Sequence, residues 1–293
     1  MSSKKIQPVM VFADADGNVY DHPDLLMLVR RGRELTLPRP DELIPLPEGS
    51  DLYLLPGRHA LGLDPESGKA EAMEERAVAA FVCPSYTLSA TAAYLPDAGA
   101  PKLPLFAYGA IGFARDRFWV AATQVDKDRR QVFANVAPER ITKGAQDLLR
   151  RYPDNRLLQH LARCALTFCC PAAKNLALGR FEAPLPTART CNARCYGCIS
   201  HQPEESGFPA SQNRIDFRPT PGEIAEVMLQ HAKRAKNPVL SFGQGCEGEP
   251  LTEAGLIAEA IGLFRSQGGR GTVNINTNAS RPDVLPGLAK AGL

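Results

Sequence analysis

Three cysteines in the second half of the chain stand close enough together to bind one metal centre. Cys191, Cys195 and Cys198 form a C-x3-C-x2-C spacing. Thiolates on so short a loop can face one point, and soft thiolate ligands select iron–sulfur clusters or zinc. They could hold three irons of a [4Fe–4S] cubane and leave the fourth iron open to a chelating ligand. A structural zinc ion needs a fourth ligand, and His201 could supply it.

The remaining five cysteines follow no regular spacing. Cys164, Cys169 and Cys170 lie within seven residues and are followed by a proline, a step that also ends some ferredoxin cluster motifs. These thiols could bind an auxiliary cluster with Cys83 or Cys246 as the fourth ligand. Alternatively they belong to the apolar core, where free cysteines are commonly buried.

From residue 176 onward, short apolar runs alternate with helical repeats. Strands are expected over residues 176–185, 238–245 and 271–279, and helices over 221–236, 253–267 and from Ser280, which is expected to cap the last one. Thr220 and Glu223 form a capping box at the start of the first helix. The βαβαβα order implies a parallel sheet with right-handed crossovers, in which ligands bind at the carboxyl ends of the strands.

Two polar segments follow the second and third expected strands. Glu247-Gly248-Glu249-Pro250 follows the second strand, and Asn276-Thr277-Asn278 ends the third. These side chains also have a purely structural interpretation. Glu249 would then be a carboxylate at a helix N-terminus, and the asparagines would satisfy backbone groups at the end of a strand.

The cysteine triplet and the two polar segments together resemble the radical S-adenosylmethionine (radical SAM) superfamily. The resemblance covers residues 176–293, about 40% of the chain. It implies that Cys191, Cys195 and Cys198 bind a [4Fe–4S] cluster. It also implies that the open iron is chelated by the amino and carboxylate groups of S-adenosylmethionine.

The same resemblance assigns cofactor contacts to the polar segments. Gly248 and Glu249 are similar to part of the family's Gly-Gly-Glu-Pro segment, which contacts the methionyl amino group. Asn276, Thr277 and Asn278 are similar to the family's Thr-Asn-Gly strand ending. The resemblance therefore implies that Gly248, Glu249, Asn276 and Asn278 contact the cofactor.

The chain departs from the family pattern at several positions. The family places an aromatic residue near the adenine, directly before the third cysteine. Here that position is Gly197, and the aromatic is Tyr196, one residue earlier. Tyr196 and Gly197 are both expected to contact the cofactor. Glu247 replaces the first glycine of the Gly-Gly-Glu-Pro segment and follows Cys246, and Ala279 replaces the glycine of Thr-Asn-Gly.

The resemblance implies radical chemistry. An electron from an external reductant such as flavodoxin or ferredoxin enters the cluster and cleaves S-adenosylmethionine into methionine and a 5′-deoxyadenosyl radical. The radical then abstracts a hydrogen atom from a substrate. The cofactor supplies this chemistry, whereas the protein supplies binding, orientation and exclusion of water. The alternative hypothesis is a non-catalytic iron–sulfur or zinc protein with a structural or sensor role.

The rest of the chain divides into a β-rich accessory domain and a helical connector. Residues 1–137 carry short apolar runs separated by turn residues, with one helix expected over 71–81. Residues 138–175 carry leucines at helical spacing, broken by Pro153, which predicts a helical hairpin. The fold expected for residues 176–293 is α/β, the first units of a partial TIM-like radical SAM barrel. Three units cannot close a barrel, so we expect a truncated chain.

Composition excludes several other classes of protein. The 293 residues carry 34 basic and 32 acidic side chains, a net charge of +2, which is not typical of proteins that bind nucleic acid or membranes through charge. No apolar run approaches the length of a membrane span, and the N-terminal segment lacks the apolar core of a secretory signal. Eight cysteines without such a signal favour metal binding in the cytoplasm over a disulfide scaffold. Residues 127–130, a charged cluster, are expected in a hairpin turn.

Overall fold

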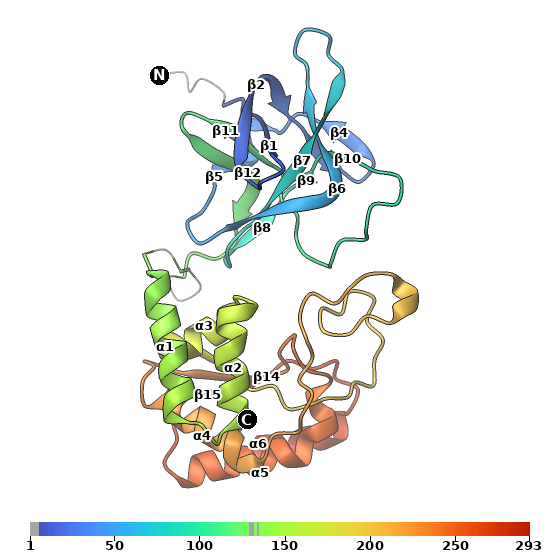
Figure 1. Cartoon of the computed structure of the whole chain (residues 1–293). Helices are drawn as coiled ribbons and strands as arrows, with labels where there is room; N and C mark the ends of the chain where they lie inside the picture. The colour runs from blue at the N-terminus through green and yellow to red at the C-terminus, as the bar shows by residue number, and fades with distance from the viewer. Residues whose placement is uncertain (1–5, 129–131, 134) are drawn as a thin grey trace. The chain divides into compact units, whose positions relative to one another are not determined.

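The computed structural model describes residues 6–128, 132–133 and 135–293, and the chain divides into two units (Figure 1). The N-terminal unit is Met1–Asn135 and the C-terminal unit is Val136–Leu293. The helices of the expected connector belong to the C-terminal unit, because they share one hydrophobic core with the strands and helices that follow. Part of the expected charged turn, Arg129 and Arg130, lies outside the described residues.

Antiparallel strands build the N-terminal unit. They are β1 (Val9–Ala13), β2 (Val19–Met27), β3 (Val29–Arg31), β4 (Glu34–Thr36), β5 (Leu43–Pro45), β6 (Asp51–Leu63), β7 (Ala70–Phe81), β8 (Tyr86–Leu88), β9 (Thr91–Ala92), β10 (Tyr94–Pro96), β11 (Ile111–Ala114) and β12 (Arg117–Gln124), with the 3-10 helix η1 (Pro40–Glu42) before β5. The larger sheet runs β10-β6-β2-β1-β11-β12-β5, with β7 paired to β1 and β6 and β8 paired to β12. A smaller sheet runs β4-β3-β9. This part is β-rich, as the sequence predicts.

The helix expected over residues 71–81 is wrong, because these residues form most of strand β7. Alanine, glutamate, methionine and arginine favour helices in isolation. Here, however, β7 pairs with both β6 and β1, and residues 77–80, three alanines and a valine, are buried. Pro56 and Gly57, residue types that favour turns, likewise lie inside β6, where the register against β7 shifts. Strand pairing overrides local propensity at both places.

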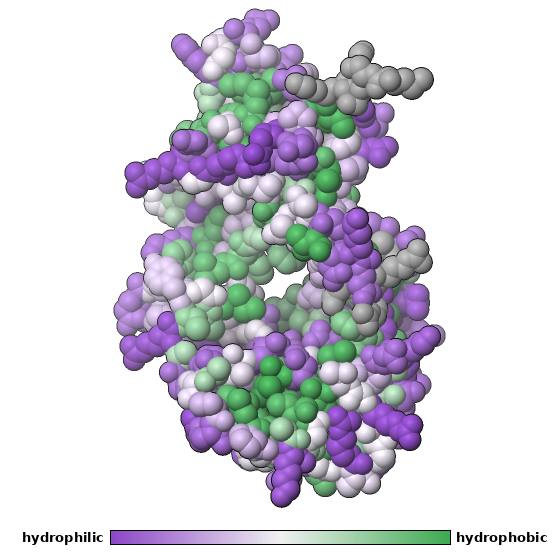
Figure 2. Space-filling model, turned by 180° about the vertical axis from the view of Figure 1, so that it is seen from behind, coloured by the Kyte–Doolittle hydropathy of each residue, from purple (hydrophilic) through white to green (hydrophobic). Residues whose placement is uncertain are grey.

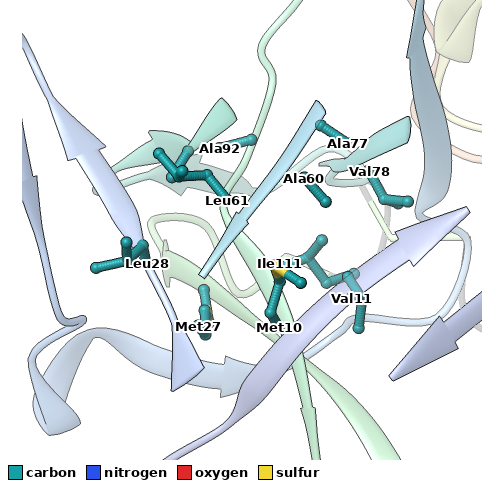
Figure 3. Close-up of a pocket in the computed structure, with 11 residues that line it drawn as sticks. Met10, Val11, Met27, Leu28, Ala60, Leu61, Ala77, Val78, Ala92 and Ile111 are labelled. Atoms are coloured by element: carbon teal, nitrogen blue, oxygen red, sulfur yellow. The ribbon is translucent and has the colours of Figure 1, made fainter. Parts of the chain in front are cut away.

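The interior of the N-terminal unit is closely packed. Apolar side chains from several strands point toward a common space, among them Met10, Met27 and Ile111 (Figure 3). This space has a volume of about 10 Å³, about that needed to hold one water molecule. It is therefore a packing void and not a chamber for a ligand.

Three helices open the C-terminal unit. They are α1 (Pro138–Arg151), α2 (Arg156–Thr167) and α3 (Pro171–Leu178). Helices α1 and α2 form the expected hairpin around Pro153. The strand expected over residues 176–185 is mostly wrong, because α3 continues to Leu178 and ends at Gly179 in a left-handed conformation. Only Glu182–Pro184 remain for strand β13.

Three parallel strands follow, as the alternating pattern predicts. β13 pairs with β14 (Val239–Phe242), and β14 pairs with β15 (Thr272–Ile275). The segments after these strands contain η2 (Glu204–Ser206), α4 (Pro221–Ala232), η3 (Pro250–Glu253), α5 (Ala254–Ser266), η4 (Pro282–Val284) and α6 (Leu285–Ala291). The three strands therefore share one carboxyl edge, to which the expected site residues are assigned.

Side chains at the helix starts explain some of these boundaries. Thr220 Oγ1 accepts a hydrogen bond from Glu223 N at 3.1 Å, and a Glu223 carboxylate oxygen accepts one from Thr220 N at 2.7 Å, which confirms the expected capping box. Glu223 also pairs with Arg156 at the start of α2, at 2.8 Å, and so joins two helices. Ser280 does not cap the last helix as expected, because η4 begins at Pro282 without a side-chain cap.

The surface of the C-terminal unit is mixed. On the face shown in Figure 2, hydrophobic side chains gather in one area bordered by hydrophilic ones.

Within the described part of the chain, none of the helices has the length and apolar character needed to traverse a bilayer.

His231 on α4 is buried, so we expect its titration to affect the stability of this unit. Its Nε2 lies 3.2 Å from the Phe181 carbonyl, and its Nδ1 has no hydrogen-bond partner among the described residues. Burial lowers the pKa of His231 from 6.5 to about 4. Below pH 6.5 the unfolded chain therefore gains a proton that the folded chain does not. We predict that the free energy of unfolding falls as the pH drops from 6.5 to about 4, by at most about 3 kcal/mol.

Urea unfolding of the C-terminal transition at several pH values measures this effect. His231→Leu removes the titrating group and should flatten the dependence in that window. His201→Gln, at an exposed position, is the matched control and should retain it. If the free energy of unfolding changed with pH equally in His231→Leu and the wild type, another group would be responsible.

Candidate metal and cofactor site

The segments that follow the three parallel strands are hydrogen-bonded to one another. Gly248 N donates to the Ala188 carbonyl at 2.6 Å, and Glu249 N donates to the Thr190 carbonyl at 3.0 Å, so the segment after β14 lies against the segment after β13. On the other side, Asn276 N donates to the Phe242 carbonyl at 3.0 Å and joins the ends of β14 and β15. The sequence motifs assigned to three separate strand ends therefore meet at one edge of the sheet.

The cysteine triplet lies on an irregular loop at this edge. Cys195 is exposed, whereas Cys191 and Cys198 are partly buried. Figure 1 shows the segment between β13 and α4, in yellow to gold, as a long excursion without regular structure apart from η2. The loop is held to the third strand end through Asn192, whose Oδ1 accepts from Asn278 Nδ2 at 2.9 Å. Asn192 Nδ2 also donates to Ser280 Oγ at 2.7 Å.

Cys198 has polar partners on its sulfur. Arg214 Nη2 lies 3.5 Å and Ser200 Oγ lies 3.7 Å from Cys198 Sγ. Burial by itself would raise the pKa of Cys198, but hydrogen bonds from the Ser200 N–H and hydroxyl and from the His201 N–H, together with the Arg214 charge, lower it below the usual value. These surroundings favour the thiolate, which is the form that binds metals.

The donor chemistry fits an iron–sulfur or zinc centre, but the thiols are not drawn together. The described residues include all eight cysteines, and none is in a disulfide. Among these residues, no three His, Cys, Asp or Glu side chains converge closely enough to hold a metal ion. Gly197, between the second and third cysteines of the triplet, lies at an open position, because a Cβ there would meet nothing within 4 Å.

Two glycines let the strand-end segments approach one another. A Cβ on Gly248 would lie 1.8 Å from the Thr190 carbonyl oxygen, directly before the first cysteine of the triplet. Gly243 has a positive φ of 78°, and a Cβ there would lie 1.8 Å from the Asn276 carbonyl oxygen. Any side chain at either position would push these segments apart.

Glu249 is buried, and three protein groups donate hydrogen bonds to its carboxylate. One oxygen accepts from Leu251 N at 3.0 Å and from the Thr277 hydroxyl, and the other accepts from Asn278 N at 2.8 Å. Glu249 thus caps η3 and also fixes the end of β15. Glu249 is therefore a carboxylate at a helix N-terminus, as its structural interpretation predicts. The cofactor contact expected for it stays a prediction.

Glu247, which departs from the family motif, has the carboxylate with the most hydrogen-bond donors at this edge. It is 4% exposed. One oxygen accepts from Thr187 N, Thr187 Oγ1 and Ala188 N at 2.8, 3.0 and 3.0 Å, and the other accepts from Gly243 N and Gln244 N at 2.6 and 2.9 Å. Burial raises the pKa of Glu247, and the backbone N–H donors of Thr187, Ala188 and Gln244 oppose that rise. This one side chain joins the ends of β13 and β14.

The other expected cofactor residues are accessible. Asn276 and Asn278 are exposed, and Asn278 Oδ1 also accepts from Ser280 N at 3.0 Å. Tyr196 is 86% exposed, with Phe208 as its ring neighbour at a centroid distance of 6.5 Å. Neither Tyr196 nor Gly197 is covered by other parts of the unit. An adenine contact for these two residues stays a prediction.

The cysteines considered for an auxiliary cluster lie in a different environment. Cys164 and Cys246 are buried, Cys170 is partly buried and Cys169 is exposed with a positive φ. Burial raises the pKa of Cys164 to about 12, and it also raises the pKa of Cys170 and of Cys246. The protonated thiol is thus favoured at these three positions, in contrast to Cys198. Cys83, the other residue expected as a possible fourth ligand, is also buried but lies in the N-terminal unit, and burial raises its pKa as well.

Sequence reasoning missed several residues that organise this edge. Asn192 and Ser200 carry no motif of their own, and Arg214 is separated from Cys198 by 16 positions without any spacing signal. Glu247 could have been noticed, because a carboxylate in place of a glycine beside a buried strand must find hydrogen-bond donors.

Replacing Gly248 tests whether its close backbone approach positions the cysteine loop. Gly248→Ala should destabilise the C-terminal unit by about 3 kcal/mol or more, because its Cβ would meet backbone atoms that cannot move independently. Gly255→Ala is the matched control, since a Cβ there meets nothing within 4 Å and the position lies in α5. The control should stabilise the unit by about 0.5–1 kcal/mol. Thermal unfolding of both variants measures the difference. Equal stabilities of Gly248→Ala and Gly255→Ala would contradict this interpretation.

Glu247→Gln tests the buried carboxylate. The substituted amide places an NH₂ group against backbone N–H donors and leaves them unsatisfied, so we expect a loss of about 2–4 kcal/mol in unfolding free energy. Glu259→Gln, at an exposed position of α5, removes the same charge and should change stability by less than about 0.5 kcal/mol. Urea denaturation of both variants provides the measurement. If Glu247→Gln unfolded at the same urea concentration as the wild type, Glu247 would not stabilise the junction of β13 and β14.

Comparison of the chain with protein-family models, with curated proteins and with solved structures gave no match in any of the three.

Proposed function

We propose that the C-terminal unit is the cofactor-binding part of a radical SAM enzyme. The observation that carries this proposal is the set of hydrogen bonds that joins three motifs at one sheet edge. The cysteine loop is bonded to the end of β15 through Asn192 and Asn278, and the segment after β14 lies between them through Gly248 and Glu249. The three motifs, which resemble the family in sequence, are thus also neighbours in space.

The proposal assigns a role to each part of this edge. Cys191, Cys195 and Cys198 would hold a [4Fe–4S] cluster. Such a cluster, with S-adenosylmethionine bound to it, supplies the reductive cleavage that yields a 5′-deoxyadenosyl radical for hydrogen abstraction from a substrate. The three parallel strands would be the first units of a partial TIM-like barrel, and the N-terminal unit would be an accessory domain.

The chain's own residues would bind and orient the cofactor. A carboxylate has about four acceptor sites, and three are used at Glu249, which leaves one for a methionyl ammonium group. The exposed amides of Asn276 and Asn278 can donate and accept hydrogen bonds at the same edge. Tyr196 and Gly197 are accessible on the loop and would lie near the adenine.

The exposure of the cysteine loop supports electron entry from outside. Cys195 and Tyr196 are exposed, so a one-electron donor such as flavodoxin or ferredoxin could approach the cluster directly. Free thiols throughout the described chain are consistent with a reducing compartment such as the cytoplasm.

Metal and sulfide analysis of the anaerobically reconstituted full chain tests the proposal. We expect about four irons and four sulfides per chain, as a [4Fe–4S] cluster requires, and release of 5′-deoxyadenosine after reduction in the presence of S-adenosylmethionine. A triple variant, Cys191→Ser, Cys195→Ser and Cys198→Ser, should lose both. Cys83→Ser, a cysteine of the other unit, is the matched control and should retain both.

Other outcomes would favour other functions. One zinc per chain without sulfide, lost on His201→Ala as well as in the triple variant, would support the zinc alternative and contradict the proposal. A cluster that neither binds nor cleaves S-adenosylmethionine would support a structural or sensor role. About eight irons per chain, two such clusters, would indicate an auxiliary cluster, for which Cys164, Cys169, Cys170 and Cys246 are the candidate ligands.

A further inference from the structure

The segment after the cysteine loop folds back onto that loop. Ser211 N and Gln212 N donate to the Ile199 carbonyl at 2.9 and 3.1 Å. Ile215 N donates to the Cys246 carbonyl at 2.8 Å. Residue 214 is therefore fixed at both sides, against the cysteine loop and against the segment after β14.

This fold-back places the Arg214 guanidinium beside one cysteine of the triplet. Its Nη2 lies 3.5 Å from Cys198 Sγ, and its Nε donates to Ser200 Oγ at 3.2 Å. The Ser200 hydroxyl is in turn 3.7 Å from the same sulfur and is buried. Two polar groups that support each other thus converge on Cys198 Sγ.

Among the residues that the structure describes, Arg214 has no carboxylate partner. Within the described residues, no carboxylate lies within the 4.0 Å of an ion pair with its guanidinium, whereas other arginines of the unit, such as Arg156 and Arg218, are paired with glutamates. Arginine presents several N–H donors and is always charged. A partly buried guanidinium that faces a sulfur is stabilised when that sulfur carries negative charge.

We infer that Arg214 is a positioning residue that raises the reduction potential of the cluster held by the triplet, with Ser200 as its support. This inference rests on the proposed function. Reduction adds one negative charge to the cluster, and hydrogen bonds and positive charge at a ligand sulfur stabilise the reduced form more than the oxidised form. The effect acts through Cys198 alone, because in the described part of the chain no side chain donates to the sulfur of Cys191 or Cys195.

Potentiometric titration of the reconstituted full chain, followed by the EPR signal of the reduced cluster, tests the inference. Arg214→Gln should shift the midpoint to a more negative value. We expect the ratio of reduced to oxidised cluster at a fixed potential to fall about tenfold, which corresponds to about 59 mV for a one-electron couple. Arg214→Lys keeps the charge but not the fork of donors, so its midpoint should lie between those of Arg214→Gln and the wild type.

The control variant removes the same charge elsewhere. Arg270 lies before β15, at the amino end of the strands, and is exposed. Arg270→Gln should therefore leave the midpoint unchanged. Ser200→Ala provides a second test, because it removes the support of the guanidinium without removing the charge, and should produce a smaller shift in the same direction.

The outcomes separate this inference from the proposal on which it rests. If the wild type binds no iron and sulfide, the proposed function fails and the inference with it. If all variants hold four irons and the midpoints of Arg214→Gln and Ser200→Ala equal that of the wild type, the inference alone is overturned. If Arg214→Gln loses the cluster, the other two variants decide the question. Reduction midpoints of Arg214→Lys and Ser200→Ala that equal the wild-type value would then overturn the inference.

Discussion

One buried carboxylate organises the edge of the sheet at which the candidate site lies. Glu247 accepts five hydrogen bonds from the segments that follow β13 and β14. A buried carboxylate is costly unless donors surround it, so the two segments must keep their positions for this residue to be satisfied. The next acidic residue, Glu249, extends the same arrangement to the end of β15. The cysteine loop begins within this framework, directly after Thr190.

The strand-end segments and the cysteine loop differ in how closely they are packed. Gly248 and Gly243 leave no space for a side chain between the strand-end segments. The cysteine loop, in contrast, carries exposed residues and open space at Gly197. The framework is thus preorganised, whereas the thiols themselves are not yet gathered around a point. A metal centre would supply the interaction that gathers them, since metal binding and local ordering are commonly coupled.

The sequence predicted the elements of the C-terminal unit better than those of the N-terminal unit, for physical reasons. The parallel strands and the capping box at Thr220 depend on local patterns, and both are present. Strand β7 has a helix-favouring composition and forms a strand only because β6 and β1 flank it. Helix α3 differs from the expected strand because the apolar run 176–178 still belongs to the helix, and Gly179 ends that helix and is not part of a strand. The environment of Cys198 could not be predicted, since Arg214 reaches it through an irregular fold-back with no periodic signal.

We propose that three thiolates hold a cluster whose remaining iron binds S-adenosylmethionine. The most direct measurement is the EPR spectrum of the anaerobically reduced full chain, recorded before and after addition of S-adenosylmethionine. We expect a reduced-cluster signal whose g values and line shape change on addition, because the cofactor would coordinate the iron that lacks a protein ligand. A reduced-cluster signal that S-adenosylmethionine leaves unchanged, at a concentration well above that of the protein, would contradict it.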